Sequence, residues 1–228
     1  MEFDKITRRL EYSFKDSDLL VNAFRHASYV NEQSDSDLED NERLEFLGDA
    51  VLELAISHLL MERFPSAEEG DLSRMRASVV DEKGLFKVAM GLELGDCLLL
   101  GRGEEQSGGR EKPSILSDTM EALLGALYLD AGFDRVLEVV EKLFGNQLDG
   151  LSIEEVRDFK SLLQEYTQRT FRSLPRYRMV EETGPAHDKR FRVILTLNEE
   201  LISEGEGKSK KEAEQRAAEE AYICLIRD

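Results

Sequence analysis

The sequence predicts two units of different fold class: an all-helical unit over residues 1–147 and a small α+β unit over residues 157–228, joined by a linker at residues 148–156. Apolar residues recur at helical spacing in the first unit, whereas alternating runs typical of strands occur only in the second. Charge changes at the same place. Residues 157–228 contain 14 Lys and Arg and 14 Asp and Glu, so the net charge of −18 falls entirely on the preceding part of the chain.

The helical unit opens with two short helices, over residues 4–10 and after Asp16, whose side chain can cap the second one. A long helix is expected from residue 41 to residue 64, because Pro65 cannot continue it. Residues 101–113 are rich in glycine and lack apolar side chains, which predicts a functional loop. The remaining helices are expected to start at Asp71, break near Asp81 and resume to Gly91, and then to span residues 114–131 and 134–145.

The second unit reads as one helix, three strands and a final helix. The first helix is expected over residues 158–170 and the last one after Lys208, with Ala213, Ala217, Ala221 and Leu225 on its buried side. Strands are expected over residues 177–181, 190–197 and 201–206. This order predicts an antiparallel sheet with both helices on one face.

Composition restricts the possible functions. Cys97 and Cys224 are too few and too far apart for a disulfide framework or a zinc site, which favours a reducing compartment. The N-terminus lacks a signal-peptide pattern and no apolar run is long enough for a bilayer, so we expect a cytoplasmic protein without a membrane partner. The acidic balance should repel nucleic acid, and any polyanionic partner must therefore be bound locally.

The long helix carries an acidic stripe. At about 100° per residue, Glu42, Glu45 and Asp49 fall within roughly 60° of one another, while Leu44, Leu47, Val51 and Leu54 fall on the opposite side. Three neighbouring carboxylates repel one another unless water or a hard divalent cation relieves the repulsion. The stripe alone is equally typical of a solvated helix face, which Glu53 would simply extend.

A second acidic pair lies on the helix expected over residues 114–131. Asp118 and Glu121 are three residues apart and share one face, and Gly125 on the same stripe should leave open space beside them. The lone His26 is more typical of a core or capping group than of a ligand. Lysines 208, 210 and 211 precede a helix, where they suit either phosphate binding or an ordinary solvated turn.

The motifs in their order resemble bacterial ribonuclease III. The resemblance to its catalytic domain rests on residues 41–50 (NERLEFLGDA), 69–76 (EGDLSRMR), 107–110 (SGGR) and 118–126 (DTMEALLGA). The last 70 residues resemble its double-stranded RNA-binding domain through residues 184–191 (GPAHDKRF) and 205–214 (GEGKSKKEAE). Two departures are Arg25, where the family commonly has threonine, and Gln106, where it frequently has lysine.

The resemblance implies a Mg²⁺-dependent homodimeric endoribonuclease that cuts both strands of an RNA duplex, with Mn²⁺ as a possible substitute. It implies 5′-phosphate and 3′-hydroxyl ends with short 3′ overhangs, in rRNA and mRNA processing, and no organic cofactor. By position, the implied metal ligands are Glu45, Asp49, Asp118 and Glu121, of which Asp49 and Glu121 are central to catalysis. Glu42 and Glu69 match accessory acidic positions at the edge of the site, and Phe46 matches a residue of the dimer interface.

The resemblance also implies how RNA is bound. The implied contacts are Gln164, Glu165 and Gln168 on the first helix of the second unit, His187 in a loop between strands, and Lys208, Lys210 and Lys211. Two other functions remain to be weighed. A non-cleaving regulator that binds duplex RNA would use the same scaffold, although no acidic position is lost here. A di-iron helical bundle needs Glu-x-x-His pairs, which the sequence lacks.

Overall fold

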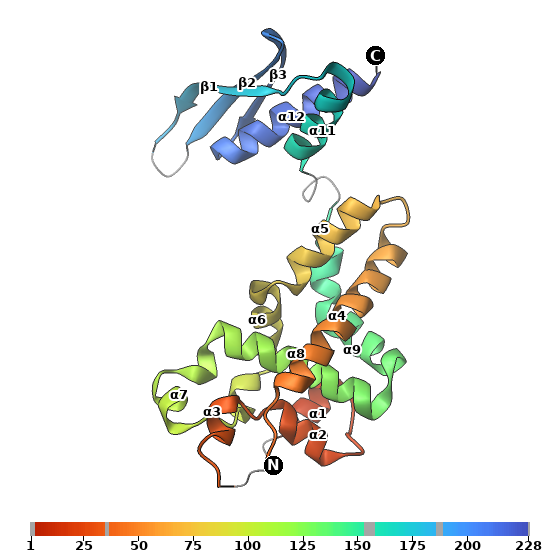
Figure 1. Cartoon of the computed structure of the whole chain (residues 1–228), viewed down its shortest axis with the longest axis vertical. Helices are drawn as coiled ribbons and strands as arrows, with labels where there is room; N and C mark the ends of the chain where they lie inside the picture. Colours follow the sequence, from red (N-terminus) through yellow and green to blue (C-terminus); the bar gives the residue numbers. More distant parts are fainter. Residues whose placement is uncertain (1–2, 35–36, 153–157, 186–188, 228) are drawn as a thin grey trace. The chain divides into compact units, whose positions relative to one another are not determined.

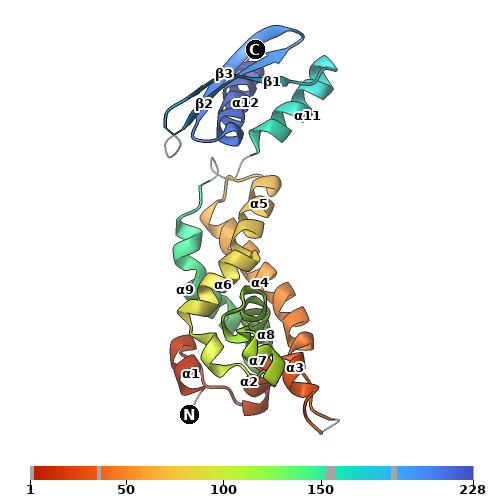
Figure 2. The same ribbon diagram turned by 90° about the vertical axis from the view of Figure 1, so that its left-hand side faces the viewer.

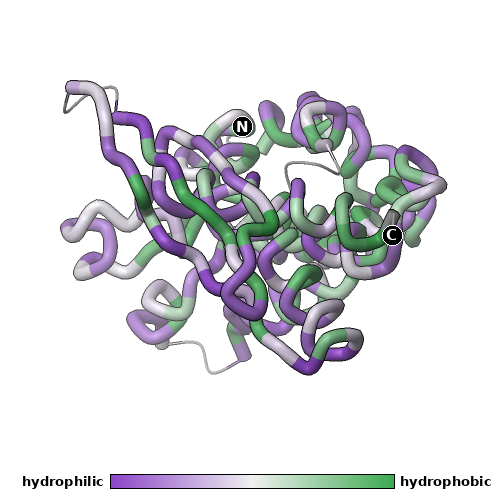
Figure 3. The backbone as a smooth tube through the Cα atoms, turned by 90° about the horizontal axis from the view of Figure 1, so that it is seen from above, coloured by the Kyte–Doolittle hydropathy of each residue, from purple (hydrophilic) through white to green (hydrophobic). Residues whose placement is uncertain are grey.

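A computed structural model describes residues 3–34, 37–152, 158–185 and 189–227. It divides the chain into two compact units, residues 1–156 and 157–228, and each is described by itself (Figure 1). The first unit is helical and the second consists of three antiparallel strands and two helices, which confirms the expected fold class. No helix among the described residues is long and apolar enough to cross a lipid bilayer. Hydrophilic and hydrophobic stretches alternate along the helices (Figure 3).

Helix α4 (Glu42–Arg63) is the long helix expected from the sequence, and it ends two residues before Pro65. Pro113 is the first residue of α8 (Pro113–Ala131), where its missing N–H group is not needed. The other elements of the first unit are α1 (Asp4–Leu10), α2 (Ser17–Ala23), α3 (Ala27–Val30), α5 (Glu69–Val80), α6 (Glu82–Gly91), η1 (Leu94–Cys97), α7 (Arg102–Gln106), η2 (Gly109–Glu111) and α9 (Phe133–Asp149).

Three boundaries differ from expectation. Helix α5 begins at Glu69, because the buried side chain of Asp71 pairs with Arg74 at 2.9 Å inside the helix instead of capping it. Helix α9 continues past Gly145, since Leu148 packs into the core and packing outweighs the weak helix propensity of glycine. The stretch 101–113 is not a plain loop, because it contains the short helices α7 and η2.

Helices α4 and α8 form the centre of the first unit, and their backbones touch where they cross. A Cβ atom on Gly48 of α4 would lie 1.8 Å from the carbonyl oxygen of Glu121 on α8. A Cβ atom on Gly125 of α8 would lie 2.2 Å from the carbonyl oxygen of Leu44. The prediction of open space beside Gly125 is therefore wrong: the backbone of α4 fills that space.

The apolar side of α4 is only partly buried. Leu44 and Val51 belong to the core, as predicted, but the side chain of Leu54 is 56% exposed. Leu54 therefore lies on a second apolar stripe of α4, together with the exposed Phe46 and Met61. A helix with two apolar faces, one of them uncovered in the single chain, indicates a surface that contacts another protein.

The second unit is built around the central strand β2. Its elements are α11 (Phe159–Phe171), β1 (Arg176–Thr183), β2 (Arg190–Leu197), β3 (Glu200–Gly207) and α12 (Lys210–Arg227), with strand order β1-β2-β3. Both helices lie on the same face of the sheet, as expected (Figures 1 and 2). Alanines on α12 allow the helix to approach closely, since a Cβ atom on Gly205 of β3 would lie 2.2 Å from the carbonyl oxygen of Ala213.

The α4–α8 contact yields a stability prediction. Gly48→Ala should lower the free energy of unfolding by about 3 kcal/mol, because the added methyl group meets backbone that cannot rotate away. Gly145→Ala is the matched control, since this helical glycine has open space around its Cβ position, and it should stabilise by up to about 1 kcal/mol. Urea unfolding followed by circular dichroism measures both. Equal effects of the two substitutions would contradict the close contact.

Candidate metal centre and nucleic-acid interface

The acidic residues of two distant segments meet beside the α4–α8 crossing. Glu45 comes from the first turns of α4, whereas Asp118 and Glu121 lie one turn apart on α8. One carboxylate oxygen from each of these three residues lies within 4.8 Å of the other two. Each of the three side chains is partly buried.

The cluster follows from local structure and packing. Glu45 precedes Gly48 by three residues and Glu121 precedes Gly125 by four, so each carboxylate stands one helical turn from a glycine at the crossing. Because those glycines allow the backbones to touch, carboxylates from both helices come within reach of one cation. The acidic side chains alone would favour the opposite result, since like charges repel.

The pKa values reflect that repulsion. Burial, followed by the charges of Asp49, Glu45 and Asp118, raises the pKa of Glu121 from 4.5 to about 8. Burial and then Asp118 are the two largest causes that raise the pKa of Glu45. Burial also raises the pKa of Asp118, against the opposing effect of His26 nearby. The protein itself therefore stabilises the ionised forms of these three carboxyl groups poorly.

The cluster fits a hard divalent cation. No Lys or Arg forms an ion pair with any of its three carboxylates within the described part of the chain, although many other acidic residues are paired in this way. Oxygen donors that lack a protein cation and that repel one another match the preference of Mg²⁺ for a few carboxylates plus water.

Asp49 and Glu42 flank the cluster on α4. Both side chains are exposed, and neither belongs to the three-residue group. Asp49 nevertheless acts on Glu121, because its charge is the largest electrostatic contribution to the raised pKa of that residue. Glu42 similarly contributes to the raised pKa of Glu45. Both residues therefore lie close enough to influence whatever the cluster binds.

Glu69 lies elsewhere in the single chain. It begins α5, accepts a hydrogen bond from Ser73 at 2.9 Å, and lines a groove of about 240 Å³ together with Met61 and Leu72. Met61 follows Glu45 by 16 residues on α4, which corresponds to about 24 Å along the helix axis. Within one chain, Glu69 therefore does not join the cluster. Phe46, on the exposed side of α4, is 82% exposed.

Two further acidic residues near the cluster were not singled out from the sequence. Asp40 contributes to the raised pKa of Glu45, and Glu82 contributes to that of Asp118. Asp40 directly precedes the acidic motif, in a stretch rich in Ser, Asp and Asn that is typical of a loop. Glu82, at the start of α6, carries no sequence signal that separates it from an ordinary first-turn acid.

The expected RNA-binding residues occupy two neighbouring helices of the second unit. Gln164, Glu165 and Gln168 are exposed on one face of α11. Lys208, Lys210 and Lys211 are exposed at the start of α12, where Glu212 accepts a hydrogen bond from the backbone N–H of Lys208 at 2.7 Å. His187 lies outside the described residues.

Glu214 connects the two helices. Its carboxylate lies 2.7 Å from Lys160 on α11 and 3.9 Å from Lys210 on α12. No ion pair of Lys208 or Lys211 occurs among the described residues, so these two cations remain available to a phosphate backbone. Acidic side chains share this surface with the lysines, since Glu212 and Glu214 lie among them.

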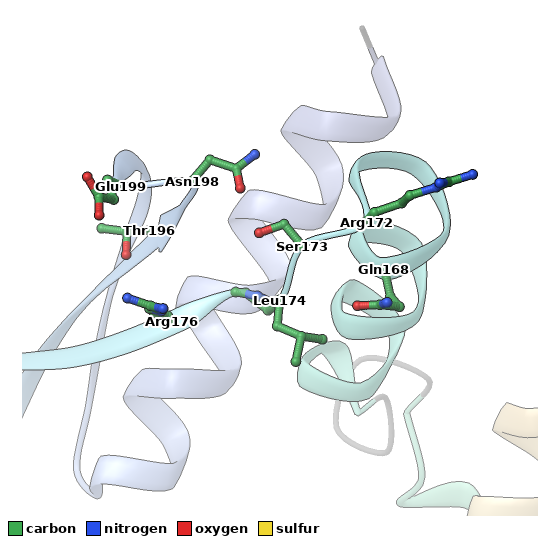
Figure 4. A pocket seen from close by; sticks show the side chains of 9 residues that line it. Gln168, Arg172, Ser173, Leu174, Arg176, Thr196, Asn198 and Glu199 are labelled. Atoms are coloured by element: carbon green, nitrogen blue, oxygen red, sulfur yellow. The ribbon is translucent and has the colours of Figure 1, made fainter.

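A larger groove of about 850 Å³ lies in the second unit, between the α11–β1 connection and the β2–β3 turn. Figure 4 shows Gln168 and Arg172 on one wall and Arg176 with Thr196 on the other. Arg172 points away from the groove, so the two guanidinium groups do not converge on a common anion. Gln168 is the only predicted contact residue that lines it.

Known proteins resemble both units. A family model described as Ribonuclease-III-like matches residues 16–148, and one described as Double-stranded RNA binding motif matches residues 159–223. The protein named Ribonuclease 3 of Bacillus licheniformis is 46% identical over 224 residues, covering 98% of this chain and 90% of that protein. Ribonuclease 3 of Myxococcus xanthus is 50% identical over 221 residues, covering 96% and 85%.

Solved structures agree. The nuclease domain of ribonuclease III from Campylobacter jejuni superposes with a TM-score of 0.59 at 43% identity, covering 65% of this chain and 97% of that one. A second structure of that domain has a TM-score of 0.57 at 45% identity and covers 63% and 99%; its title refers to a region involved in dimer formation.

Fold, site and comparisons together define an endoribonuclease that carries its own module for double-stranded RNA. More specifically, the chain belongs to the ribonuclease III family.

The raised pKa of Glu121 predicts how stability depends on pH without metal. A carboxyl group whose folded pKa lies above its unfolded value favours folding when protonated, so this contribution is present below pH 4.5 and is lost as the pH rises towards 8. Glu121→Gln removes the charge. The metal-free variant should therefore melt at a higher temperature than the parent protein at pH 8.5, by roughly 2–4 °C for each kcal/mol recovered.

Differential scanning calorimetry of both proteins at pH 5 and pH 8.5 measures the effect. If the three carboxylates bind Mg²⁺, adding it should remove the advantage of the variant at pH 8.5, because only the parent has all three carboxylates. A difference in melting temperature that is the same at both pH values would contradict the raised pKa.

Proposed function

We propose that this protein hydrolyses phosphodiester bonds in both strands of an RNA duplex with Mg²⁺ as its natural metal and Mn²⁺ as a substitute. The products would carry 5′-phosphate and 3′-hydroxyl ends with short 3′ overhangs. The observation that carries this proposal is that Glu45, Asp118 and Glu121 converge without a Lys or Arg ion-pair partner among the described residues, in a chain that also holds a double-stranded RNA-binding motif.

The proposed roles follow the positions of the carboxylates. Glu45, Asp118 and Glu121, which are partly buried, would hold the metal, and the exposed Asp49 would complete the ligand set. When bound there, Mg²⁺ would make water more acidic and stabilise charge on the leaving 3′ oxygen. Asp49 and Glu121 act closest to the reaction in this proposal, whereas Glu42 attracts the cation and orders water at the rim. Metal also reverses the sign of a site that would otherwise repel phosphate.

RNA recognition is assigned to the second unit. Gln164, Glu165 and Gln168 suit the shallow minor groove of A-form RNA, whose 2′-hydroxyl groups both donate and accept hydrogen bonds. Lys208, Lys210 and Lys211 would contact phosphates at the start of α12. His187 keeps its proposed minor-groove role on the family resemblance alone. Maturation of rRNA and mRNA in the cytoplasm is the proposed setting, consistent with a chain whose two cysteines are too few and too far apart in the sequence for a disulfide framework.

A homodimer would account for the exposed stripe of α4. In a two-fold interface, residue i contacts residue j and j contacts i. If two α4 helices pack antiparallel, Phe46 of one copy reaches the groove beside Met61 and Leu72 of the other. The same arrangement moves Glu69 of the second copy toward the metal cluster of the first. Each dimer would then carry two clusters, one for each RNA strand.

A regulator that binds duplex RNA without cutting it is the second candidate from another class. The intact acidic set argues against it, because a protein that only binds RNA has no use for carboxylates that repel phosphate. The two candidates differ in one observable, namely whether strands are broken when metal is present.

Cleavage separates these candidates. The parent protein with a long RNA duplex and Mg²⁺ should yield short duplexes, whereas Glu121→Gln should lower the cleavage rate by a factor of about 100 or more, because it removes a negative metal ligand. Binding of the duplex, measured by fluorescence anisotropy in Ca²⁺, should change less than threefold. Intact duplex after incubation with micromolar parent protein would refute the endonuclease.

The dimer has its own test. Phe46→Glu should convert the protein to monomers at micromolar concentration, because a charge would be buried in an apolar groove. Leu129→Glu is the matched control, since Leu129 is also exposed but lies on α8, away from the stripe. Sedimentation velocity measures both. An unmodified protein that sediments as a monomer at 50 μM would refute the proposed homodimer.

A further inference from the structure

Asn41 stands directly before α4 but does not cap it. Asparagine is among the residues that best satisfy the free N–H groups at a helix start through their side-chain oxygen. Here the side chain forms no capping hydrogen bond, and the residue is only 4% exposed. The free N–H group of Glu42 is instead bonded by the side chain of Asp40 at 3.2 Å.

The Asn41 amide points inward, to a different part of the chain. Its Nδ2 group donates a hydrogen bond to the carbonyl oxygen of Ala23 at 3.2 Å, and its backbone N–H donates to that of Arg25 at 2.9 Å. Its own carbonyl oxygen accepts the N–H group of Glu45 at 2.9 Å. One residue thus links the segment after α2 to the turn of α4 that carries a cluster carboxylate.

The segment 23–25, which accepts the hydrogen bonds of Asn41, is itself held by burial and by backbone hydrogen bonds. Ala23 and Phe24 are fully buried in the core of the helical unit. The backbone of Leu99 donates to Phe24 at 2.9 Å and accepts from His26 at 3.1 Å, which ties this segment to the chain before α7. Asn41 therefore anchors α4 to a fixed point and not to a mobile loop.

The first turn of α4 needs such an anchor. The close contact between α4 and α8 is made at Leu44 and Gly48, and Asn41 adds a second attachment at the very start of the helix, where helix ends fray when nothing holds them. The neighbouring charges of Asp118, Glu42 and Asp49 disfavour the charged form of Glu45, so they do not help to hold this turn in place.

We infer that Asn41 is a positioning residue for the metal cluster: its two hydrogen bonds to the 23–25 segment hold the first turn of α4 so that Glu45 stays within reach of Asp118 and Glu121. The role rests on the proposed function, because Glu45 is a metal ligand only in that proposal. Asn41 itself touches neither metal nor RNA.

The test uses metal binding without RNA. Asn41→Ser keeps an oxygen that can cap the helix but is too short to reach Ala23, and it should weaken Mn²⁺ binding about tenfold, as loss of a residue behind a ligand typically does. Electron paramagnetic resonance of free Mn²⁺ measures this on the full chain. The affinity for duplex RNA in the absence of metal should stay unchanged, since the second unit is untouched.

Tyr12→Phe is the matched control. It removes a hydrogen bond of 2.6 Å between Tyr12 and Asp130, which also connects distant segments of the helical unit but lies away from the cluster. It should lower the melting temperature without changing Mn²⁺ affinity. If Asn41→Ser likewise only lowers the melting temperature, the positioning role is refuted while the metal site stands. If the parent protein binds no Mn²⁺, the proposed metal site fails and the inference fails with it.

Hydrogen exchange of the metal-free parent protein gives a test that needs no variant. The N–H group of Glu45 bonds to the carbonyl oxygen of Asn41 before α4, just as the N–H group of Leu72 bonds to that of Glu68 before α5, where Glu68 is exposed and forms no side-chain cap. The Glu45 amide should exchange at least about tenfold more slowly than the Leu72 amide. Equal or faster exchange at Glu45 would overturn the inference even if the variant did not fold.

Discussion

The backbone contact between α4 and α8 is the constraint on which the rest of the helical unit depends. Helix axes usually stay 8–10 Å apart because side chains separate them. Gly48 and Gly125 have no side chains, so each glycine lies directly against a backbone carbonyl oxygen of the other helix. Everything that faces the crossing must accommodate that approach, including the leucines of the core on one side and the carboxylates on the other.

The same contact creates an electrostatic problem that the fold does not solve internally. Two like charges about 4 Å apart repel by about 4 kcal/mol at the effective dielectric near a protein surface. A domain is stabilised by only about 5–15 kcal/mol in total, so a cluster of carboxylates consumes a large part of that margin. The protein relieves the repulsion by holding a proton on Glu121 up to a pH of about 8. A cation can replace that proton, which couples metal loading to stability.

Much of this could be predicted from local sequence signals. Pro65 predicted the end of the long helix, and the alternation in residues 190–197 predicted strand β2. What failed depended on tertiary contacts. Gly125 gives no sign of what fills the space beside it, and Leu54 looks like a core residue because periodicity does not reveal which of two apolar faces meets the same chain.

For the site, local spacing likewise predicted which residues share a helix face but not which faces meet. Spacing placed Asp118 and Glu121 on one helix face, and Glu45 and Asp49 on another, but only the family resemblance suggested that the two faces meet. The position of Glu69 on α5, beside Met61 and about 16 residues along α4 from Glu45, could not follow from a motif, because a motif records order and not distance. Asn41 was hidden for another reason: its residue type predicts a cap, and only its burial reveals a different task.

The unpaired lysines at the start of α12 have a consequence for how the enzyme meets its substrate. At physiological ionic strength a charge is screened beyond about 8 Å, so an approaching duplex senses local patches and not the total of −18. In the proposed function, first encounters would be made through Lys208 and Lys211, and the acidic unit would engage afterwards. Because the acidic unit would repel polyanions until it binds metal, the time that the protein spends on RNA before metal binds would depend mainly on the smaller, neutral unit.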